Sequence, residues 1–439
     1  MKIQLIFPAI EHGVTTVHDK KSWARIIFGY PAITLPMLAA LTPRKHTVEI
    51  INENYQDIDF DTDADIIGIT SFTMTAPHVY EIADKFRENG KTVVLGGYHP
   101  SALPEEAEQH ADAVVIGEAE LSWPQLLQDF EKKKKIKPFY HAGTFDPAII
   151  PPIRRDLIKP MPIVGAMQTT RGCPNRCEFC AITSFYNHGV KHRPIENVIE
   201  ELKQMPNRVF LFHDPSLNID MDYSRKLFKE MIKAKIRKAW IANGNINMLG
   251  RADDEYLKLA KEAGCIEWFV GFESVSQKNL NEIKKVCNKV AEFRRITQRV
   301  RKFGMAIQAG IIFGFDNDTP EIFDETIEQL YEWGVDAAEI NILTPFPGTP
   351  LYDRLEREGR ILTKDWSKYT QVDVVFQPKH MTPKELFEGA RKVAKKFYSL
   401  TDVIKRMYGT FKISKSINML HMHAAQFAYR RYYKRDYGF

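Results

Sequence analysis

The chain has 439 residues, which is long for one domain and predicts two or three. Hydrophobic residues make up 44% of it and charged residues 27%, so we expect a large folded core and exclude extensive disorder. A net charge of +5 is mild at this length, and it permits an acidic ligand or a membrane surface as partner without requiring either.

The beginning of the chain and its cysteine usage favour a cytoplasmic protein. The segment MKIQLIFPAI predicts a strand that ends at Pro8, and no apolar run reaches the ~18–20 residues of a membrane span. No small-residue cleavage site follows a hydrophobic stretch, so we expect no secretory signal. Five cysteines, three of them close together, do not resemble a secreted disulfide framework.

The first 130 or so residues alternate short apolar strands with helical patterns. Continuous Val/Ile-rich runs are typical of buried parallel strands, so residues 1–145 are predicted to form a doubly wound, Rossmann-like α/β domain. The strands are expected in KIQLIF, TVEIINE, DIIGITSF, TVVLGGYHP and DAVVIGEAE, with helices in PAITLPMLAALTP and APHVYEIADKFRENG between them.

Small residues end three of these predicted strands. They are Ser71, the pair Gly96 and Gly97, and Gly117. In open parallel sheets ligands bind beyond the carboxyl ends of the strands, where small side chains would let a bulky flat ligand approach the backbone. Ordinary turn residues would give the same pattern, so both interpretations stay open at this point.

A connecting region separates this domain from a second βα series. The charge run 131–138 and the proline-rich stretch 147–156 are interpreted as solvated sequence, with the linker placed at 146–160. Six βα units in residues 161–365 then predict a partial, TIM-like (β/α)6 barrel, open on one side. Its strands are expected in IVGAMQTT, RVFLFHD, KAWIANGN, CIEWFVGFE, AIQAGIIFGF and AAEINILTP.

Residues 366–439 are predicted to form a helical C-terminal region. The last residues, FAYRRYYKRDYGF, are both aromatic and basic. Such a tail could contact RNA, lipid headgroups or a pigment. More often it is a helix packed on its own domain, and that interpretation is favoured here.

Three thiols in one loop carry the chemistry. The segment TTRGCPNRCEFC follows the first predicted barrel strand and contains Cys173, Cys177 and Cys180. Thiolate sets of this kind select zinc or iron–sulfur clusters. A structural zinc site needs a fourth ligand, but the neighbouring sequence offers none, and Cys265 and Cys287 lie far along the chain. We therefore favour a four-iron cluster, in which three cysteine ligands leave one iron open.

The CxxxCxxC spacing, with Phe179 before the last cysteine, resembles the signature of the radical S-adenosylmethionine (SAM) superfamily. The resemblance implies that Cys173, Cys177 and Cys180 hold a [4Fe–4S] cluster whose open iron binds the amino and carboxylate groups of SAM. An electron from the cluster would cleave SAM to a 5′-deoxyadenosyl radical that abstracts hydrogen from an unactivated carbon. Reduced flavodoxin or ferredoxin is the electron donor that this implies.

Further matches to that family follow at strand ends, where barrel enzymes keep their sites. FHDP, with His213 and Asp214, resembles the second-strand motif near the SAM amino group. GFES, with Glu273 and Ser274, resembles the fourth-strand motif, whose acid accepts hydrogen bonds from the SAM ribose. GIIFGFDND, with Gly314, resembles the adenine-side glycine motif of the fifth strand, and NILTPFPGTPLY the sixth-strand segment. Their order and spacing make the resemblance specific.

The first domain resembles the cobalamin-binding domain fused to one large radical SAM class, on the strength of Ser71, Gly96, Gly97 and Gly117. In such domains the nucleotide tail of cobalamin lies between the sheet and a helix. The DxHxxG loop that supplies a cobalt-ligating histidine in many B12 domains is absent, since FPAIEHGVTT follows the first strand. His12 lies there without an aspartate to orient it, so we expect cobalamin without a lower-face protein histidine.

Over nearly its full length the chain resembles cobalamin-dependent radical SAM methyltransferases, in particular the subgroup that modifies hopanoid lipids or bacteriochlorophyll side chains. The resemblance implies that one SAM yields the radical, methylcobalamin methylates the substrate carbon, and a second SAM remethylates the cobalt. The cofactors supply the hard chemistry, and the protein orients them and excludes water. The expected substrate is a lipid, a tetrapyrrole or another small molecule, with peripheral membrane contact left open and nucleic acid not expected.

Other functions stay open on the sequence. The same scaffold could catalyse cyclisation, oxidation or rearrangement without methyl transfer. A non-enzymatic cobalamin or zinc sensor would leave the strand-end motifs without a purpose, and an RNA methylthiotransferase should carry cysteines in residues 1–160, which have none. Five aromatic residues could line an apolar substrate pocket or pack in the core, namely Phe185, Tyr186, Trp240, Trp268 and Phe346.

Overall fold

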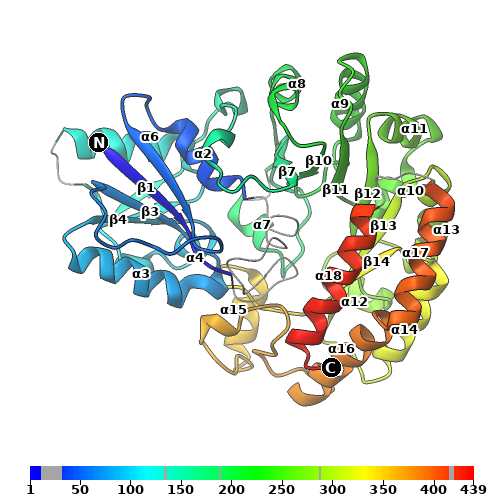
Figure 1. Cartoon of the computed structure of the whole chain (residues 1–439). Coiled ribbons are helices and arrows are strands. Elements are labelled where there is room, and N and C mark those ends of the chain that lie inside the picture. Colours follow the sequence, from blue (N-terminus) through cyan, green and yellow to red (C-terminus); the bar gives the residue numbers. More distant parts are fainter. Residues whose placement is uncertain (11–31, 133–135, 187–188, 286–287, 415–419) are drawn as a thin grey trace.

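The computed structural model describes residues 1–10, 32–132, 136–186, 189–285, 288–414 and 420–439 (Figure 1). Within these residues the chain forms two six-stranded parallel sheets and one short antiparallel ribbon. The first sheet and its helices lie at one end of the molecule in Figure 1, and the second sheet with the C-terminal helices lies at the other. His12, Cys287 and the middle of the lysine run lie outside the described residues.

The first sheet has the strand order β2-β1-β3-β4-β5-β6, and every neighbouring pair is parallel. Helices α2 and α6 cover one face, where Trp123 packs against Leu5, and α3 covers the other. The predicted doubly wound domain is therefore confirmed. The elements are β1 (Lys2–Phe7), α2 (Thr34–Leu41), β2 (Thr47–Asn52), β3 (Ile66–Thr70), α3 (Ala76–Glu88), β4 (Thr92–Gly96), α4 (Tyr98–Ala102), α5 (Pro104–Glu108), β5 (Ala113–Ile116), α6 (Ala119–Glu131) and β6 (Phe139–His141).

The second sheet has the order β7-β10-β11-β12-β13-β14, all parallel, which confirms the six expected barrel strands and their sequence. Because each strand pairs with the next one of the series, the sheet is a barrel wall with two free edges, at β7 and β14. The strands are β7 (Val164–Met167), β10 (Val209–Phe212), β11 (Ala239–Gly244), β12 (Cys265–Glu273), β13 (Ala306–Phe313) and β14 (Ala337–Ile342).

Amphipathic helices pack on the outer face of this wall, with their apolar sides in one continuous core. A short ribbon of β8 (Thr170–Arg171) and β9 (Lys191–His192) stands at the entry and exit of the cysteine loop. The helices are α7 (Ala181–Phe185), α8 (Ile195–Gln204), α9 (Met221–Lys233), α10 (Ile246–Arg251), α11 (Asp254–Glu262), α12 (Gln277–Glu282), α13 (Val290–Lys302), α14 (Ile322–Trp333) and α15 (Pro350–Arg357).

Tyrosine hydroxyls form hydrogen bonds with backbone groups at the edge of β14 that pair with no other strand. The hydroxyl of Tyr433, on α18 (Leu420–Asp436), accepts a hydrogen bond from the Ile340 amide at 2.6 Å. Tyr398, just after α16 (Pro383–Phe397), accepts from the Ala338 amide and donates to the Ala338 carbonyl. Unpaired groups on an edge strand would otherwise invite pairing with another chain. The aromatic tail therefore packs on its own domain, as favoured from the sequence.

The segment after the barrel returns to the first domain. Trp366 and Tyr369 belong to the same buried cluster as the inner residues of α3. The indole of Trp366 donates to Glu106 at 3.0 Å, and Tyr80 and His99 also hydrogen-bond this carboxylate. Burial alone would raise the pKa of Glu106, but the hydrogen bonds from His99, Tyr80 and Trp366 lower it below its usual value. Residues that follow the barrel thus complete the core of the first domain.

Replacing Tyr433 by Phe should leave the buried Ile340 amide without its partner. We expect a loss of about 1–2 kcal/mol in the free energy of unfolding, measured by urea denaturation. The matched control is Tyr408→Phe on α17 (Leu400–Ser414), because Tyr408 is exposed, and its effect should stay within about 0.5 kcal/mol. Equal losses in the two variants would show that the hydroxyl contributes nothing at the strand edge.

Candidate functional site

A cavity of about 800 Å³ lies between the carboxyl ends of the two sheets. One of its walls comes from the ends of β3, β4 and β5, and the facing wall from the cysteine loop and the ends of β10, β11 and β12. All three motif cysteines and the three glycines singled out in the first domain line this single space, namely Cys173, Cys177, Cys180, Gly96, Gly97 and Gly117. Two patterns found independently in the sequence therefore meet at one site.

The cysteine loop turns sharply at a residue that must be glycine. Gly172 has a φ of +81°, and a Cβ on it would lie 1.8 Å from the carbonyl oxygen of Gly189. Burial raises the pKa of the Cys173 thiol, and it raises that of Cys177 to about 12. Three thiols of one loop, of which Cys177 is buried and the other two are partly exposed, face the same space. Such a donor set fits an iron–sulfur cluster, whose positive irons would hold the sulfurs as thiolates.

An ion pair that the sequence did not reveal stands beside the cysteines. The Lys285 ammonium pairs with Glu273 at the end of β12 and donates to the Gly271 carbonyl at 3.1 Å. Burial would lower the pKa of Lys285, but the Glu273 carboxylate and the Cys177 thiol raise it above its usual value. Glu273 has a φ of +67°, within a strand irregularity that turns its side chain toward the cavity. No sequence motif indicates a role for Lys285, because its partner Glu273 comes next to it only when the chain between them folds.

Asp214 fastens the start of the cysteine loop to the end of β10. Its buried carboxylate accepts hydrogen bonds from the Thr169 amide and hydroxyl, both at 2.6 Å, and from the Thr170 amide at 2.8 Å. Burial raises the pKa of Asp214 to about 6, against the opposing effect of these hydrogen bonds. The neighbouring His213 lines the cavity, as does Phe179.

Three of the predicted site residues do not line the cavity. The Ser274 hydroxyl accepts from the Asn279 side chain at 3.1 Å, and the Ser71 hydroxyl donates to the Phe72 carbonyl at 3.0 Å. Gly314 has a φ of +105° and packs under Phe376. The alternatives left open for the aromatic residues also separate here: Phe185, Tyr186 and Phe346 line the cavity, whereas Trp240 and Trp268 are buried in the barrel core.

Glycines shape the first-domain wall of the cavity. At Gly97 the φ is +103°, and a Cβ would lie 2.7 Å from the Ser71 carbonyl oxygen. A Cβ on Gly68 would lie 2.8 Å from Leu5, and this glycine, which sequence reasoning missed, lines the cavity where it extends toward Trp123. Gly97 keeps the sheet edge clear of side chains, and Gly68 does the same for the extension of the cavity toward Trp123. This shape fits a ligand with a wide, flat part and an extended arm.

Buried charges join the two walls. Arg171, two residues before Cys173, lies 3.0 Å from Glu118 and 2.5 Å from Glu120, which follow the end of β5. Lys191 on β9 pairs with the other oxygen of Glu118. Burial would lower the pKa of Arg171, but Glu120 and Glu118 raise it above its usual value. We call these four residues the interdomain clamp.

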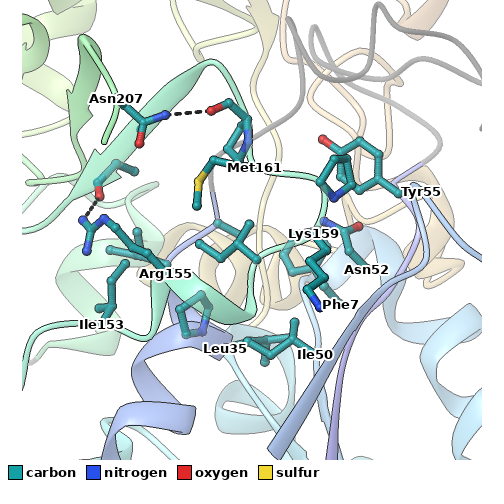
Figure 2. Close-up of a pocket in the computed structure, with 18 residues that line it drawn as sticks. Phe7, Leu35, Ile50, Asn52, Tyr55, Ile153, Arg155, Lys159, Met161 and Asn207 are labelled. Atoms are coloured by element: carbon teal, nitrogen blue, oxygen red, sulfur yellow. Dashed lines mark hydrogen bonds between the residues drawn. The ribbon is translucent and has the colours of Figure 1, made fainter. Parts of the chain in front are cut away.

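A small second pocket of about 40 Å³ adjoins the main cavity and shares Phe7 with it (Figure 2). It lies between the first domain and the segment that enters the barrel. There the Asn207 amide donates to the Pro162 carbonyl at 2.7 Å, and Arg155 donates to the Ala166 carbonyl at 2.6 Å (Figure 2). This volume holds about one or two water molecules, so we interpret the pocket as a packing gap beside the site.

A three-thiol loop on a parallel barrel, facing a glycine-lined sheet edge across one cavity, defines an enzyme that combines an iron–sulfur cluster with a large flat cofactor. Comparisons with known proteins agree. The chain matches the model of the radical SAM superfamily over residues 167–330, that of the B12 binding domain over 30–127, and a domain of unknown function, DUF4070, over 349–432.

Relatives span nearly the whole chain. Bacteriochlorophyllide d C-12(1)-methyltransferase of Chlorobaculum tepidum is 30% identical and covers 92% of this chain and 93% of its own. Bacteriochlorophyllide d C-8(2)-methyltransferase of the same organism is 32% identical over 80% and 82%. The structure of the radical SAM methyltransferase TsrM from Kitasatospora setae, with cobalamin and a [4Fe–4S] cluster bound, superposes with a TM-score of 0.69 at 14% identity and covers 99% of each chain.

The chain therefore belongs to the radical SAM superfamily, in the class that carries an N-terminal B12-binding domain. It is an enzyme of the cobalamin-dependent C-methyltransferase type, with a [4Fe–4S] cluster, SAM and cobalamin as its cofactors. The fold, the family and the three cofactors expected from the sequence are thereby confirmed. That no protein histidine binds the cobalt stays a prediction, since His12 lies outside the described residues.

Replacing Glu118 by Gln should weaken the interdomain clamp, because Lys191 and Arg171 would lose a buried carboxylate. We expect a loss of about 1–3 kcal/mol in the free energy of unfolding. As a control, Glu255→Gln removes a partner of Arg225 from an exposed ion pair, and its effect should be at most about 1 kcal/mol. If both variants unfold at the same urea concentration, the clamp does not stabilise the docked domains.

Proposed function

We propose that the enzyme methylates a side-chain carbon of a bacteriochlorophyllide-type tetrapyrrole bound in the cavity between its two domains. The observation that carries the proposal is that one cavity is lined both by the three motif cysteines and by the glycines of the first-domain edge. The two Chlorobaculum tepidum relatives, each named for methylation of bacteriochlorophyllide d, supply the substrate class.

The lining of the cavity suits a flat macrocycle. Tyr98 packs within 6.3 Å of Phe185 and 6.4 Å of Phe346, measured between ring centroids, and all three line the cavity. Aromatic faces of this kind stack on conjugated rings. Among the described lining residues, the lysine and the arginine, Lys285 and Arg171, are each paired with a carboxylate. We infer that the macrocycle is held by its faces rather than by ionic contact at its rim.

Each set of residues has a distinct part in this proposal. Cys173, Cys177 and Cys180 hold the cluster, while Glu273, oriented by Lys285, accepts hydrogen bonds from the SAM ribose. Gly96, Gly97 and Gly117 let cobalamin approach the edge of the first sheet. When bound, these cofactors supply the radical and the methyl group, and the protein positions them and excludes water from the cavity.

The electron donor is proposed to be reduced flavodoxin or ferredoxin, and the compartment a reducing cytoplasm. The described cysteines are all free thiols, as an iron–sulfur protein in such a compartment requires. Reduction of the purified enzyme by flavodoxin, followed by formation of 5′-deoxyadenosine, is the direct test of the donor.

Replacing Cys173, Cys177 and Cys180 together by Ala should separate the two cofactors. After anaerobic reconstitution with iron, sulfide and hydroxocobalamin, the wild type should retain about four irons and one cobalt per chain. The triple variant should lose the iron and form no 5′-deoxyadenosine, yet keep the cobalt, because the thiols lie on the barrel wall. Tightly held zinc without iron in the wild type would sink the cluster assignment.

Replacing Gly97 by Ala should remove cobalamin and leave the iron–sulfur cluster in place. Its added Cβ would meet the Ser71 carbonyl, so we expect the cobalt content to fall at least tenfold while iron stays at the wild-type level. Gly90→Ala is the matched control, since Gly90 also has a positive φ, of +71°, but nothing within 4 Å of the added Cβ. Full cobalt retention in Gly97→Ala would place cobalamin elsewhere.

The substrate is tested by incubating the loaded enzyme, SAM and a reductant with bacteriochlorophyllide d. Mass spectrometry of the pigment should find one added methyl group, labelled when the SAM methyl is labelled. A changed pigment without added methyl would favour cyclisation or oxidation on the same scaffold. No change, with 5′-deoxyadenosine still formed, would exclude this tetrapyrrole and leave the cofactor assignments standing.

A further inference from the structure

Helix α17 carries an exposed apolar stripe on the barrel half of the molecule. Four large side chains on it face solvent, at spacings of four, four and three residues that place them on one side of the helix. They are Leu400, Ile404, Tyr408 and Phe411, with exposed fractions of 50%, 55%, 65% and 58%.

The inward side of this helix is less apolar than that of an ordinary surface helix. Its inward side holds Thr410, which donates to the buried Asp336 at 2.5 Å, and Arg406, whose guanidinium lies 3.7 Å from the centre of the Phe397 ring. Val403 is fully buried on the same side, so α17 packs through a mixed polar and apolar side and leaves the apolar stripe outside. Single exposed apolar residues are normal, but four on consecutive turns of one helix indicate a binding surface.

The charges around the stripe indicate what it binds. Lys405 and Lys412 are exposed along one side of it, and the Lys412 ammonium lies 5.5 Å from the centre of the Tyr408 ring. The one acid of α17, Asp402, accepts a hydrogen bond from the Ser399 hydroxyl at the start of the helix. Apolar side chains flanked by lysines complement an anionic lipid surface, whereas two copies of this face would bring their lysines together.

We propose that α17 is a membrane-contacting helix that lies in the plane of an anionic phospholipid surface, with the stripe among the headgroups. This inference does not depend on the proposed substrate. None of the helices in the described ranges is long and apolar enough to cross a bilayer. Helix α17 packs on α13 and α16, at the far end of the molecule from the first sheet, so the contact leaves the interdomain cavity uncovered (Figure 1).

The test is co-sedimentation of the cofactor-loaded protein with vesicles of phosphatidylcholine alone or with phosphatidylglycerol added. Binding should require the anionic lipid and weaken as salt is raised. Ile404→Ser with Phe411→Ser should reduce partition into anionic vesicles by at least about tenfold. Lys405→Gln with Lys412→Gln should reduce it by about fivefold per lysine at low salt.

The matched control is Ile163→Ser with Leu362→Ser, which removes two side chains of 53% and 52% exposure from loops away from α17 and should leave binding unchanged. Wild-type protein that binds neither vesicle, or an Ile404/Phe411 variant that binds as well as the wild type, overturns the proposal. A dimer in light scattering that the Ile404/Phe411 variant dissociates, without vesicle binding, would assign the stripe to a second copy of the chain. Unchanged melting temperatures would confirm that the variants fold.

Discussion

The buried ion pairs between Arg171 and the carboxylates of Glu118 and Glu120 hold together the two walls of the cavity. Arg171 lies two residues before Cys173, the first cluster cysteine, and Glu118 directly follows Gly117 at the end of β5. A charge cluster that has left water is stable only when all its partners remain in place, because a buried charge left alone is far more costly than a missing apolar contact. The clamp therefore favours the docked arrangement in which Arg171 meets both carboxylates.

The rest of the site follows from the same docking. Parallel strands gather their loops at one edge, and two such edges face each other only when the two sheets are held end to end. The barrel wall is not closed, and the C-terminal tyrosines accept hydrogen bonds from two amides that its β14 edge leaves unpaired with another strand. Glycines then set how near a ligand comes to the first sheet. Positive φ at Gly97 and Gly117 is a property of backbone that no larger residue reproduces without strain.

Local features were predictable from the sequence. The cysteine spacing is a single-loop property, and the Val/Ile runs of the barrel mark their strands in order, down to the start of β12 at Cys265. Strand β6 was missed because three residues after a lysine run give no periodicity. Lys285 and Arg171 were missed for a different reason. Their partners lie on other elements, so their burial and pairing are decided by the tertiary structure. Ser274 was misplaced relative to the cavity because the positive φ at Glu273 redirects the chain after it.

The return of Trp366 and Tyr369 to the core of the first domain bears on how this protein can be divided. A core completed by residues from beyond the barrel is not a module that can be cut out at the linker or exchanged with a homologous domain alone. During synthesis the N-terminal domain must wait, with part of its apolar surface uncovered, until more than three quarters of the chain has left the ribosome. Recombination between relatives would therefore keep the first domain together with the segment around Trp366 and Tyr369.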